Sequence, residues 1–390
     1  MHILLAPSVW NKGIVPPNIF FAAGATDEND WKDVTNKFLA SGDAALSNNQ
    51  VKESIEIYLQ GIELLPSIWS GEESNPQSDG DVDGDDNDDE TELPDEKVIE
   101  AIISLHTNYA TALSYLEGST ENVVAAYRKA CWCYQNYVRQ RQQQSDDNDV
   151  ENIPKEIAPV AASSYFYLGM TYQDLASSAA TPTESGTMDS GKQMQYLENS
   201  ARAYAKATKI DPNHWSSYAN MGVVLADVGT DGSGNKAISL ELYEEGIMSY
   251  QMAIDILAGA ANNGGGNDAG PTDPPGNKNE VIAELQYRIG LCLVPFLFTQ
   301  QMESDGSSVE DYNTRKCTLH STPNAQEPNS PAITRSCLEL AAYSFSNALQ
   351  SYRYHDGANN ALNLVTADAT FGMSTDVTFV QNLFEEYASR

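Results

Sequence analysis

Basic residues are scarce in this chain. Across 390 residues, 22 Lys and Arg stand against 55 Asp and Glu, which gives a formal net charge of -33 at pH 7. A charge of this sign repels polyphosphates and anionic lipid surfaces unless a local basic patch overcomes it, and the sequence contains no such patch. We therefore expect neither nucleic acid nor a membrane as a partner. The clustered acids are typical of solvated tracts, with an acidic recognition element as the alternative.

Cysteines and long apolar runs are also few. The chain has five cysteines, an odd number, and no usable Asn-x-Ser/Thr glycosylation acceptor. Both features favour a reduced, cytoplasmic setting. No stretch approaches the roughly 18 apolar residues of a membrane span. The N-terminal MHILLAPSVW has no basic segment before its apolar run, so a signal peptide is not expected.

Motifs for catalysis and metal binding are missing. The five histidines show no H-E-x-x-H spacing, and neither a G-x-S-x-G pattern nor a P-loop occurs. On a helix, Cys131 and Cys133 would point about 200° apart, so they cannot jointly hold one ion there. Residues 264–266 are three glycines in a tract of Asn, Gly and Pro without a preceding strand, which indicates a linker. We predict no catalytic residue, no metal site and no cofactor.

One stretch does fit a metal-loop template. DGDVDGDDNDDE (79–90) matches the calcium-loop pattern D-x-[DN]-x-[DN]-G-x5-E at every specified position. Its flanks are rich in Gly, Asn and Pro and predict no helix, and Asp86 occupies the central position that is usually apolar. No second loop exists to pair with it. We interpret the stretch as an acidic linker with at most weak, salt-sensitive calcium binding.

A helical repeat dominates the rest of the sequence. The stretch 38–66 places Gly42 on one helical face and Tyr58 and Gly61 on a second, and it ends at Pro66. This resembles the tetratricopeptide repeat, a helix pair of about 34 residues with the pattern W-x2-L-G-x2-Y, then A-x3-F, then P. Small residues let the two antiparallel helices approach, a large aromatic fills the space beside them, and the proline stops the second helix.

Further copies of this pattern follow along the chain. Most of them combine a glycine in a first helix with an aromatic residue in a second. Their key positions are Tyr127 and Ala130, then Gly169, Tyr172 and Tyr204, then Gly222, Gly246 and Tyr250, and finally Gly290, Ala341 and Phe345. The sequence therefore predicts an all-α fold, a tetratricopeptide-like α-solenoid of about five helix pairs over residues 31–357.

Polar tracts interrupt the repeats. They are rich in Gly, Pro, Asp, Asn and Ser and cannot bury enough apolar surface to offset the entropy of ordering. Residues 1–30 are expected to form an irregular N-terminal segment. Long disordered insertions are predicted at 70–95, 142–156, 176–193, 258–279 and 303–332.

Binding of a protein or peptide partner is the predicted function of the solenoid. Stacked helix pairs make a concave face that can hold a peptide or a helix. Members of the family that bind chaperone tails use Lys and Asn where this chain has Leu39 and Asp43, which argues against a chaperone adaptor. We predict partner contacts from four first-helix residues, with ordinary helix-surface roles as the alternative. They are Gln173, Asn220, Tyr287 and Arg288.

The C-terminal segment, 358–390, does not repeat the pattern. Its stretch FVQNLFEEYA (379–388) resembles the junction that follows tetratricopeptide repeats in a family of S-adenosylmethionine-dependent methyltransferases. The same apolar spacing is compatible with a capping helix. Two alternatives therefore stay open: a non-catalytic interaction scaffold, or the repeat region of a methyltransferase whose catalytic domain is missing from this chain.

Overall fold

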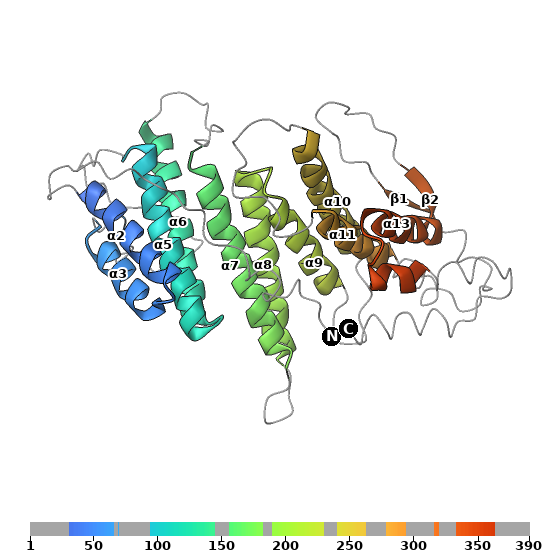
Figure 1. The fold of residues 1–390 in the computed structure, drawn as a ribbon, viewed down its shortest axis with the longest axis horizontal. Coiled ribbons are helices and arrows are strands. Elements are labelled where there is room, and N and C mark those ends of the chain that lie inside the picture. Colours follow the sequence, from blue (N-terminus) through green and yellow to red (C-terminus); the bar gives the residue numbers. More distant parts are fainter. Residues whose placement is uncertain are drawn as a thin grey trace. The chain divides into compact units, whose positions relative to one another are not determined.

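The part of the chain that the structure describes is predominantly helical, and successive helices pack on one another (Figure 1). The structure is a computed structural model. It describes residues 31–65, 69, 94–144, 156–181, 189–229, 240–262, 278–293, 316–319 and 333–362. These residues divide into two compact units between Pro212 and Asn213. None of the described helices is long and apolar enough to cross a membrane.

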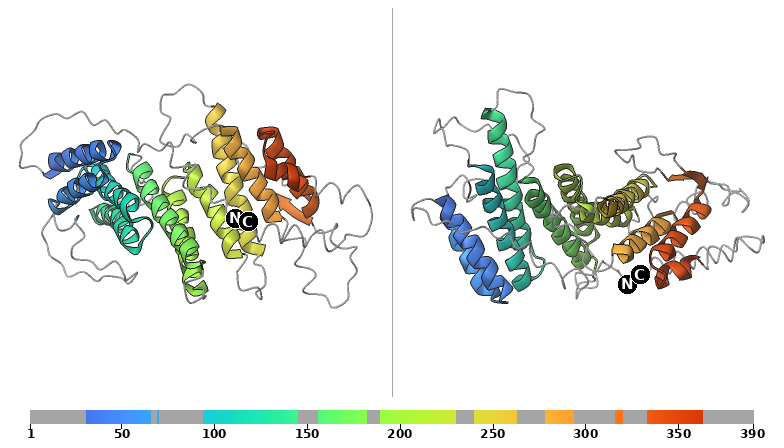
Figure 2. Two further views of the ribbon diagram at one scale, coloured as in Figure 1. Left: turned by 60° about the horizontal axis from the view of Figure 1, so that its bottom comes forward. Right: turned by 45° about the horizontal axis from the view of Figure 1, so that its top comes forward.

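The unit before Pro212 consists of helix pairs, in which we call the earlier member the first helix and the later one the second. Each second helix packs on its own first helix, and Figure 2 gives two further views of these pairs. The pairs are α2 (Trp31–Ser47) with α3 (Val51–Glu63), α5 (Glu96–Glu117) with α6 (Glu121–Gln144), and α7 (Ala158–Ala179) with α8 (Ser190–Ile210).

Contacts between neighbouring pairs are unequal in this unit. The second helix α3 packs on α5, and α6 packs on α7. First helices also touch one another directly, α2 against α5 and α5 against α7, far more extensively than successive second helices do. The first helices therefore form one close layer, with α5 at its centre.

Polar residues set several helix ends. The Asp95 side chain accepts a hydrogen bond from the backbone N–H of Val98 at 2.9 Å and caps the start of α5. Asp189 caps α8 in the same way through Lys192. Helix α5 ends at Gly118, whose φ is 72°. Glycine suits this position because a residue with a side chain rarely adopts this backbone conformation.

The unit after Pro212 contains two more helix pairs and a short β-ribbon. In the pairs, α9 (Trp215–Gly229) packs on α10 (Leu240–Asn262), and α11 (Lys278–Leu293) packs on both α10 and α13 (Cys337–Ser351). A last described helical segment covers 356–362. The strands β1 (Lys316–Leu319) and β2 (Ile333–Ser336) pair antiparallel and lie against α13.

Glycine–aromatic contacts hold four of the five pairs together. A Cβ atom added to the first-helix glycine would fall inside the ring of its second-helix partner, so only glycine fits. The closest ring atoms would be 2.2 Å away for Gly42 and Tyr58, 2.6 Å for Gly169 and Tyr204, 2.7 Å for Gly222 and Tyr250, and 2.3 Å for Gly290 and Phe345. These are the glycines and aromatics that the sequence pattern predicts. In the remaining pair, α5 and α6, the hydroxyl oxygens of Thr111 and Tyr127 lie 3.0 Å apart and share a hydrogen bond.

The predicted helical architecture is thus confirmed, but the structure differs from the prediction within the predicted insertions. Strand β1 lies inside the range 303–332, where only a loop is predicted, because a four-residue strand carries too short a pattern to detect. Helices α7 and α8 both extend into 176–193, and α10 extends into 258–279. The added turns of α7 and α10 contain alanine, the strongest helix former, and the added turn of α8 is capped by Asp189, but all three have little apolar periodicity. Residues 1–30 and the stretch 79–90 lie outside the described residues.

Replacing Gly222 by alanine tests the glycine–aromatic contact. The new methyl group would press on the fully buried Tyr250 ring, and such overpacking costs about 1–3 kcal/mol of unfolding free energy. Gly259, in the second helix of the same pair, is the matched control, since a Cβ there meets nothing within 4 Å. Gly259→Ala should stabilise by up to about 1 kcal/mol. Urea unfolding followed by circular dichroism measures both, and equal effects would contradict the packing role.

Candidate functional site

The hydroxyl groups of second-helix tyrosines point to the first-helix layer. Tyr58 donates to Asp43 Oδ1 at 2.6 Å, and Asn108 Nδ2 donates to the same oxygen at 2.8 Å. One carboxylate thereby joins α2, α3 and α5. In the third pair, Tyr204 donates to Gln173 Oε1 at 2.7 Å. The second helices therefore fix polar groups of the first helices in position.

Aromatic rings of α5, α6 and α7 continue this polar layer. Tyr127 stacks on Tyr167 with ring centroids 5.9 Å apart, and Phe166 meets Tyr167 edge-on at 5.4 Å. Tyr115 interacts electrostatically with both tyrosines, yet its own side chain is 54% exposed. The layer thus ends at the surface in a ring that is free to contact a ligand.

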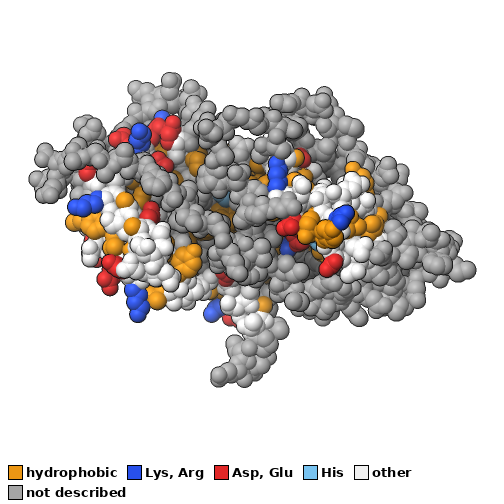
Figure 3. All heavy atoms as spheres, in the orientation of Figure 1, with side chains coloured by type: hydrophobic (Ala, Val, Ile, Leu, Met, Phe, Trp, Pro, Cys, Tyr) orange, Lys and Arg blue, Asp and Glu red, His pale blue; other side chains and the backbone are white. Residues whose placement is uncertain are grey.

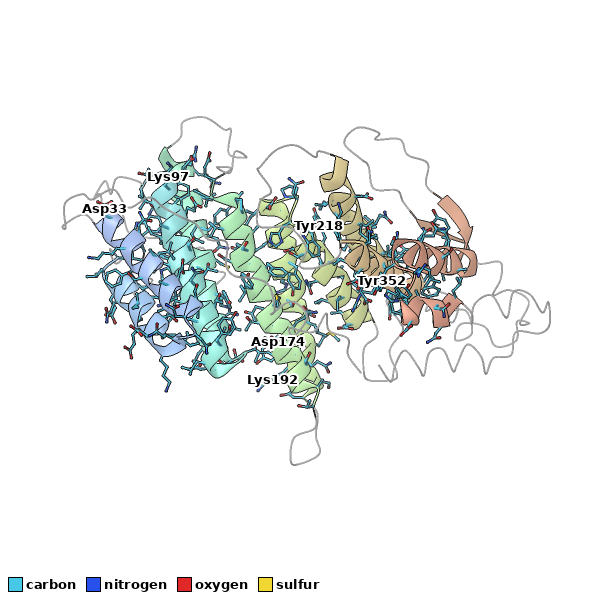
Figure 4. All side chains as sticks on the ribbon, viewed as in Figure 1. Asp33, Lys97, Asp174, Lys192, Tyr218 and Tyr352 are labelled. Carbon is cyan, nitrogen blue, oxygen red and sulfur yellow. The ribbon has the colours of Figure 1, made fainter. Side chains whose placement is uncertain are left out.

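A second carboxylate closes the series at the C-terminal end of α7. Asp174, labelled in Figure 4, accepts a hydrogen bond at 2.6 Å from Ser119, just after α5. Positions three, four or seven apart share one face of a helix. We name the resulting surface the first-helix face, and it consists of Asp43, Asn108, Thr111, Tyr115, Tyr167 and Asp174.

Burial governs the electrostatics of this face. Desolvation raises the pKa of Asp43 above its ordinary 3.8, and the hydrogen bonds from Tyr58 and Asn108 only partly offset it. Desolvation likewise raises the pKa of Asp174 against the bond from Ser119. Within the described part of the chain, no Lys, Arg or His forms an ion pair with either carboxylate. The Lys and Arg side chains visible in Figure 3 are dispersed and form no patch.

A contrasting ionic cluster lies in the unit after Pro212. Arg288 Nε donates to Glu284 Oε1 at 2.7 Å, and His355 Nε2 lies 3.0 Å from Glu284 Oε2. All three side chains are less than a fifth exposed. Burial would raise the pKa of Glu284, but Arg288 and His355 together hold it below its ordinary 4.5. The buried charge is therefore neutralised within the molecule.

His355 also begins the helical segment 356–362. Its Nδ1 accepts the backbone N–H of Ala358 at 3.1 Å, so the ring proton resides on Nε2 and is donated to Glu284. Next to it, a Cβ at Gly357 would lie 3.0 Å from the Tyr287 ring, which packs on His355 at 4.9 Å between centroids. This cluster connects α11 to the end of the described chain.

The four predicted partner-contact residues occupy different surroundings. Gln173 is 6% exposed and bonded to Tyr204, and Tyr287 is 7% exposed between Phe345 and His355. The structure brings Tyr287 and Arg288 together in the cluster on α11. Asn220, on α9, is half-buried and donates to the Ser216 carbonyl oxygen at 2.9 Å. Their role in partner contact stays a prediction.

Sequence reasoning missed Asn108, Thr111, Tyr115 and Asp174 as site residues. A signal for three of them was present, because positions 108, 111 and 115 follow helical spacing and are polar or aromatic. Asp174 gives no comparable signal, since its place on the face depends on how α7 packs against the end of α5.

The cysteines of the described residues offer no reactive centre. Cys131, Cys133 and Cys292 are free and buried. Burial raises the pKa of the Cys292 thiol to about 12, so the reactive thiolate is negligible near neutral pH. In the described ranges, no three His, Cys, Asp or Glu side chains gather in a position to hold a metal ion.

Comparison with known proteins adds no assignment. No protein-family model matches the chain, and no curated protein is significantly similar to it.

Glu284→Gln tests the buried cluster. It removes the carboxylate that Arg288 binds, and breaking one partner of a buried ion pair costs about 3–5 kcal/mol of unfolding free energy near neutral pH. Because the pKa of folded Glu284 is lowered, its contribution is present above about 4.5 and is lost as the pH falls through the folded value. Urea unfolding of the natural protein and of Glu284→Gln, at pH values from neutral to below 4.5, measures the difference in unfolding free energy. The double variant Glu284→Met with Arg288→Met should lose much less, and an equal loss would contradict pairing as the cause.

Asp43→Asn with Asp174→Asn tests the two half-buried carboxylates of the first-helix face. Asparagine still accepts the hydrogen bonds but carries no charge, so the variant should be more stable than the natural protein at neutral pH. Since folding raises both pKa values, the cost of the ionised groups is full above the folded pKa and vanishes below about 3.8. The gain in melting temperature should therefore shrink on acidification. Glu56→Gln with Glu63→Gln removes two exposed charges as the control, and an equal gain from it would point to general charge repulsion.

Proposed function

We propose that this chain is a non-catalytic interaction scaffold of tetratricopeptide type, which binds a peptide or a helix on its first-helix face. The observation that carries the proposal is the combination on one face of an exposed tyrosine, packed aromatic rings and half-buried polar groups. Asp43 and Asp174 lie at its two ends, and Tyr115 supplies its exposed ring. Surfaces that bind partners are enriched in such tyrosines, whose rings are apolar and whose hydroxyls are polar.

The packing of the helices supports this choice of face. Helix α5 contacts both α2 and α7, whereas successive second helices contact one another much less, and this is the packing expected of a stack that curves with its first helices inside. The concave side of a stacked-helix solenoid offers an extended surface for a ligand. The polar ends of Tyr58 and Tyr204 hold groups on this side in place, so the site is ordered before a ligand arrives.

The remaining predictions are compatible with this proposal. The buried free thiols fit the reducing cytoplasm that we propose as its location. The methyltransferase alternative depends on residues 379–388, which lie outside the described part of the chain. It remains a prediction from the sequence alone.

A peptide-display selection on the full chain tests the proposal. We expect enriched peptides whose affinity falls at least tenfold, about 1.4 kcal/mol, in Tyr115→Ala, because the variant removes an exposed ring without opening the core. Leu59→Ala is the matched control, since Leu59 is an exposed apolar residue of the second helix α3 with 39% exposure. Fluorescence anisotropy measures both affinities.

Two results would contradict the proposed site. The first is a selection that enriches no peptide above background. The second is a set of binding peptides that lose as much affinity in Leu59→Ala as in Tyr115→Ala, which would place binding elsewhere or make it unspecific.

A further inference from the structure

The two carboxylates of the first-helix face are held only by neutral donors in the described structure. Asp43 receives the Tyr58 hydroxyl and the Asn108 amide, and Asp174 receives the Ser119 hydroxyl. Both are partly desolvated, and neither has an ion pair among the residues that the structure describes. A desolvated charge without a counter-ion is costly, so its retention needs a reason.

The cluster around Glu284 shows how the same molecule treats a carboxylate with a structural role. There the charge is neutralised by Arg288 and by the hydrogen bond from His355. On the first-helix face, Asp43 and Asp174 are less deeply buried than Glu284 and accept hydrogen bonds, but no described residue supplies a cation to them. A ligand is the missing source of positive charge that would complete the same arrangement.

Aromatic rings of the first-helix face suit a cation as well. Tyr115 exposes more than half of its side chain, and it interacts electrostatically with Tyr127 and Tyr167, which stack on each other. The face of a tyrosine ring attracts Lys and Arg side chains. The molecule already uses this contact elsewhere, with Arg128 5.7 Å from the Tyr172 ring and Lys206 5.7 Å from the Tyr165 ring.

Charge excludes other occupants of the face. A second copy of this chain carries a net charge of -33, and the acidic stretch 79–90 of the chain itself has the same sign as the face. Both would add repulsion to carboxylates that have no counter-ion among the described residues. An acidic or neutral peptide would bury them without compensation.

We propose that the partner is a basic peptide segment that places Lys or Arg side chains against Asp43 and Asp174 and against the Tyr115 ring. This inference rests on the proposed function, because it names the chemistry of the ligand on the same face. Because both carboxylates are already partly desolvated, these ion pairs would contribute more than pairs at an open surface.

Defined probes test this inference on the full chain. They are an amphipathic helical peptide with Lys on its polar face, the same peptide with Gln in place of Lys, and the same peptide with Glu. The Lys peptide should bind most tightly at physiological ionic strength. Its affinity should fall about tenfold in Asp43→Asn with Asp174→Asn, which is expected to fold stably. The matched control is Glu56→Gln with Glu63→Gln, which removes the same net charge from the second helix α3 and should change affinity less than about twofold.

The outcomes separate this inference from the proposed function. Equal losses in the two double variants would mean that the Lys peptide is attracted by net charge alone, and would overturn the inference. Tighter binding of the Gln or Glu peptide would overturn it too. If binding of those peptides, or of neutral or acidic peptides from the selection, still depends on Tyr115, the proposed function stands and only the basic partner falls. If no peptide binding depends on Tyr115, both fail.

Discussion

Four of the five helix pairs depend on close contact between a glycine and an aromatic ring. With no Cβ on the first helix, the ring of the second helix lies directly on the backbone, and four pairs repeat this contact between 2.2 and 2.7 Å from the absent Cβ position. The contact sets how near the two helices lie and how they are rotated. It also points the tyrosine hydroxyls toward the first-helix layer, where they meet Asp43 and Gln173.

Packing and site are therefore one arrangement in the unit before Pro212. The hydrogen bonds that fix polar groups on the first-helix face come from residues whose rings form the core. Tyr58 is fully buried and still reaches Asp43, and Tyr204 does the same for Gln173. A change in how two helices approach would displace the groups that a ligand would contact, which is why a rigid pair suits a binding face.

The sequence predicts the helix pairs because their key residues lie in a regular local pattern. Gly169, for example, lies in YFYLGMTY and Tyr204 in SARAYAKA, and each stretch carries small and aromatic residues at the spacing of its own helix. The face is harder to predict, since its contacts join residues far apart in the chain: 65 positions separate Asp43 from Asn108, and 55 separate Ser119 from Asp174. Gln173 was placed on the correct helix, but its contact with Tyr204 depends on the packing between helices. The β-ribbon is too short for any periodicity to reveal.

The lengths of the connections between paired helices bear on how the chain folds. Only 16 positions separate Gly42 from Tyr58, whereas 55 separate Gly290 from Phe345, although the final contacts are alike. Closing the longer loop costs about 1 kcal/mol more chain entropy, by the logarithmic dependence on length. Contacts that are local in sequence also form faster. The α2–α3 pair is thus suited to form early, and the α11–α13 pair gains most from neighbours that are already folded.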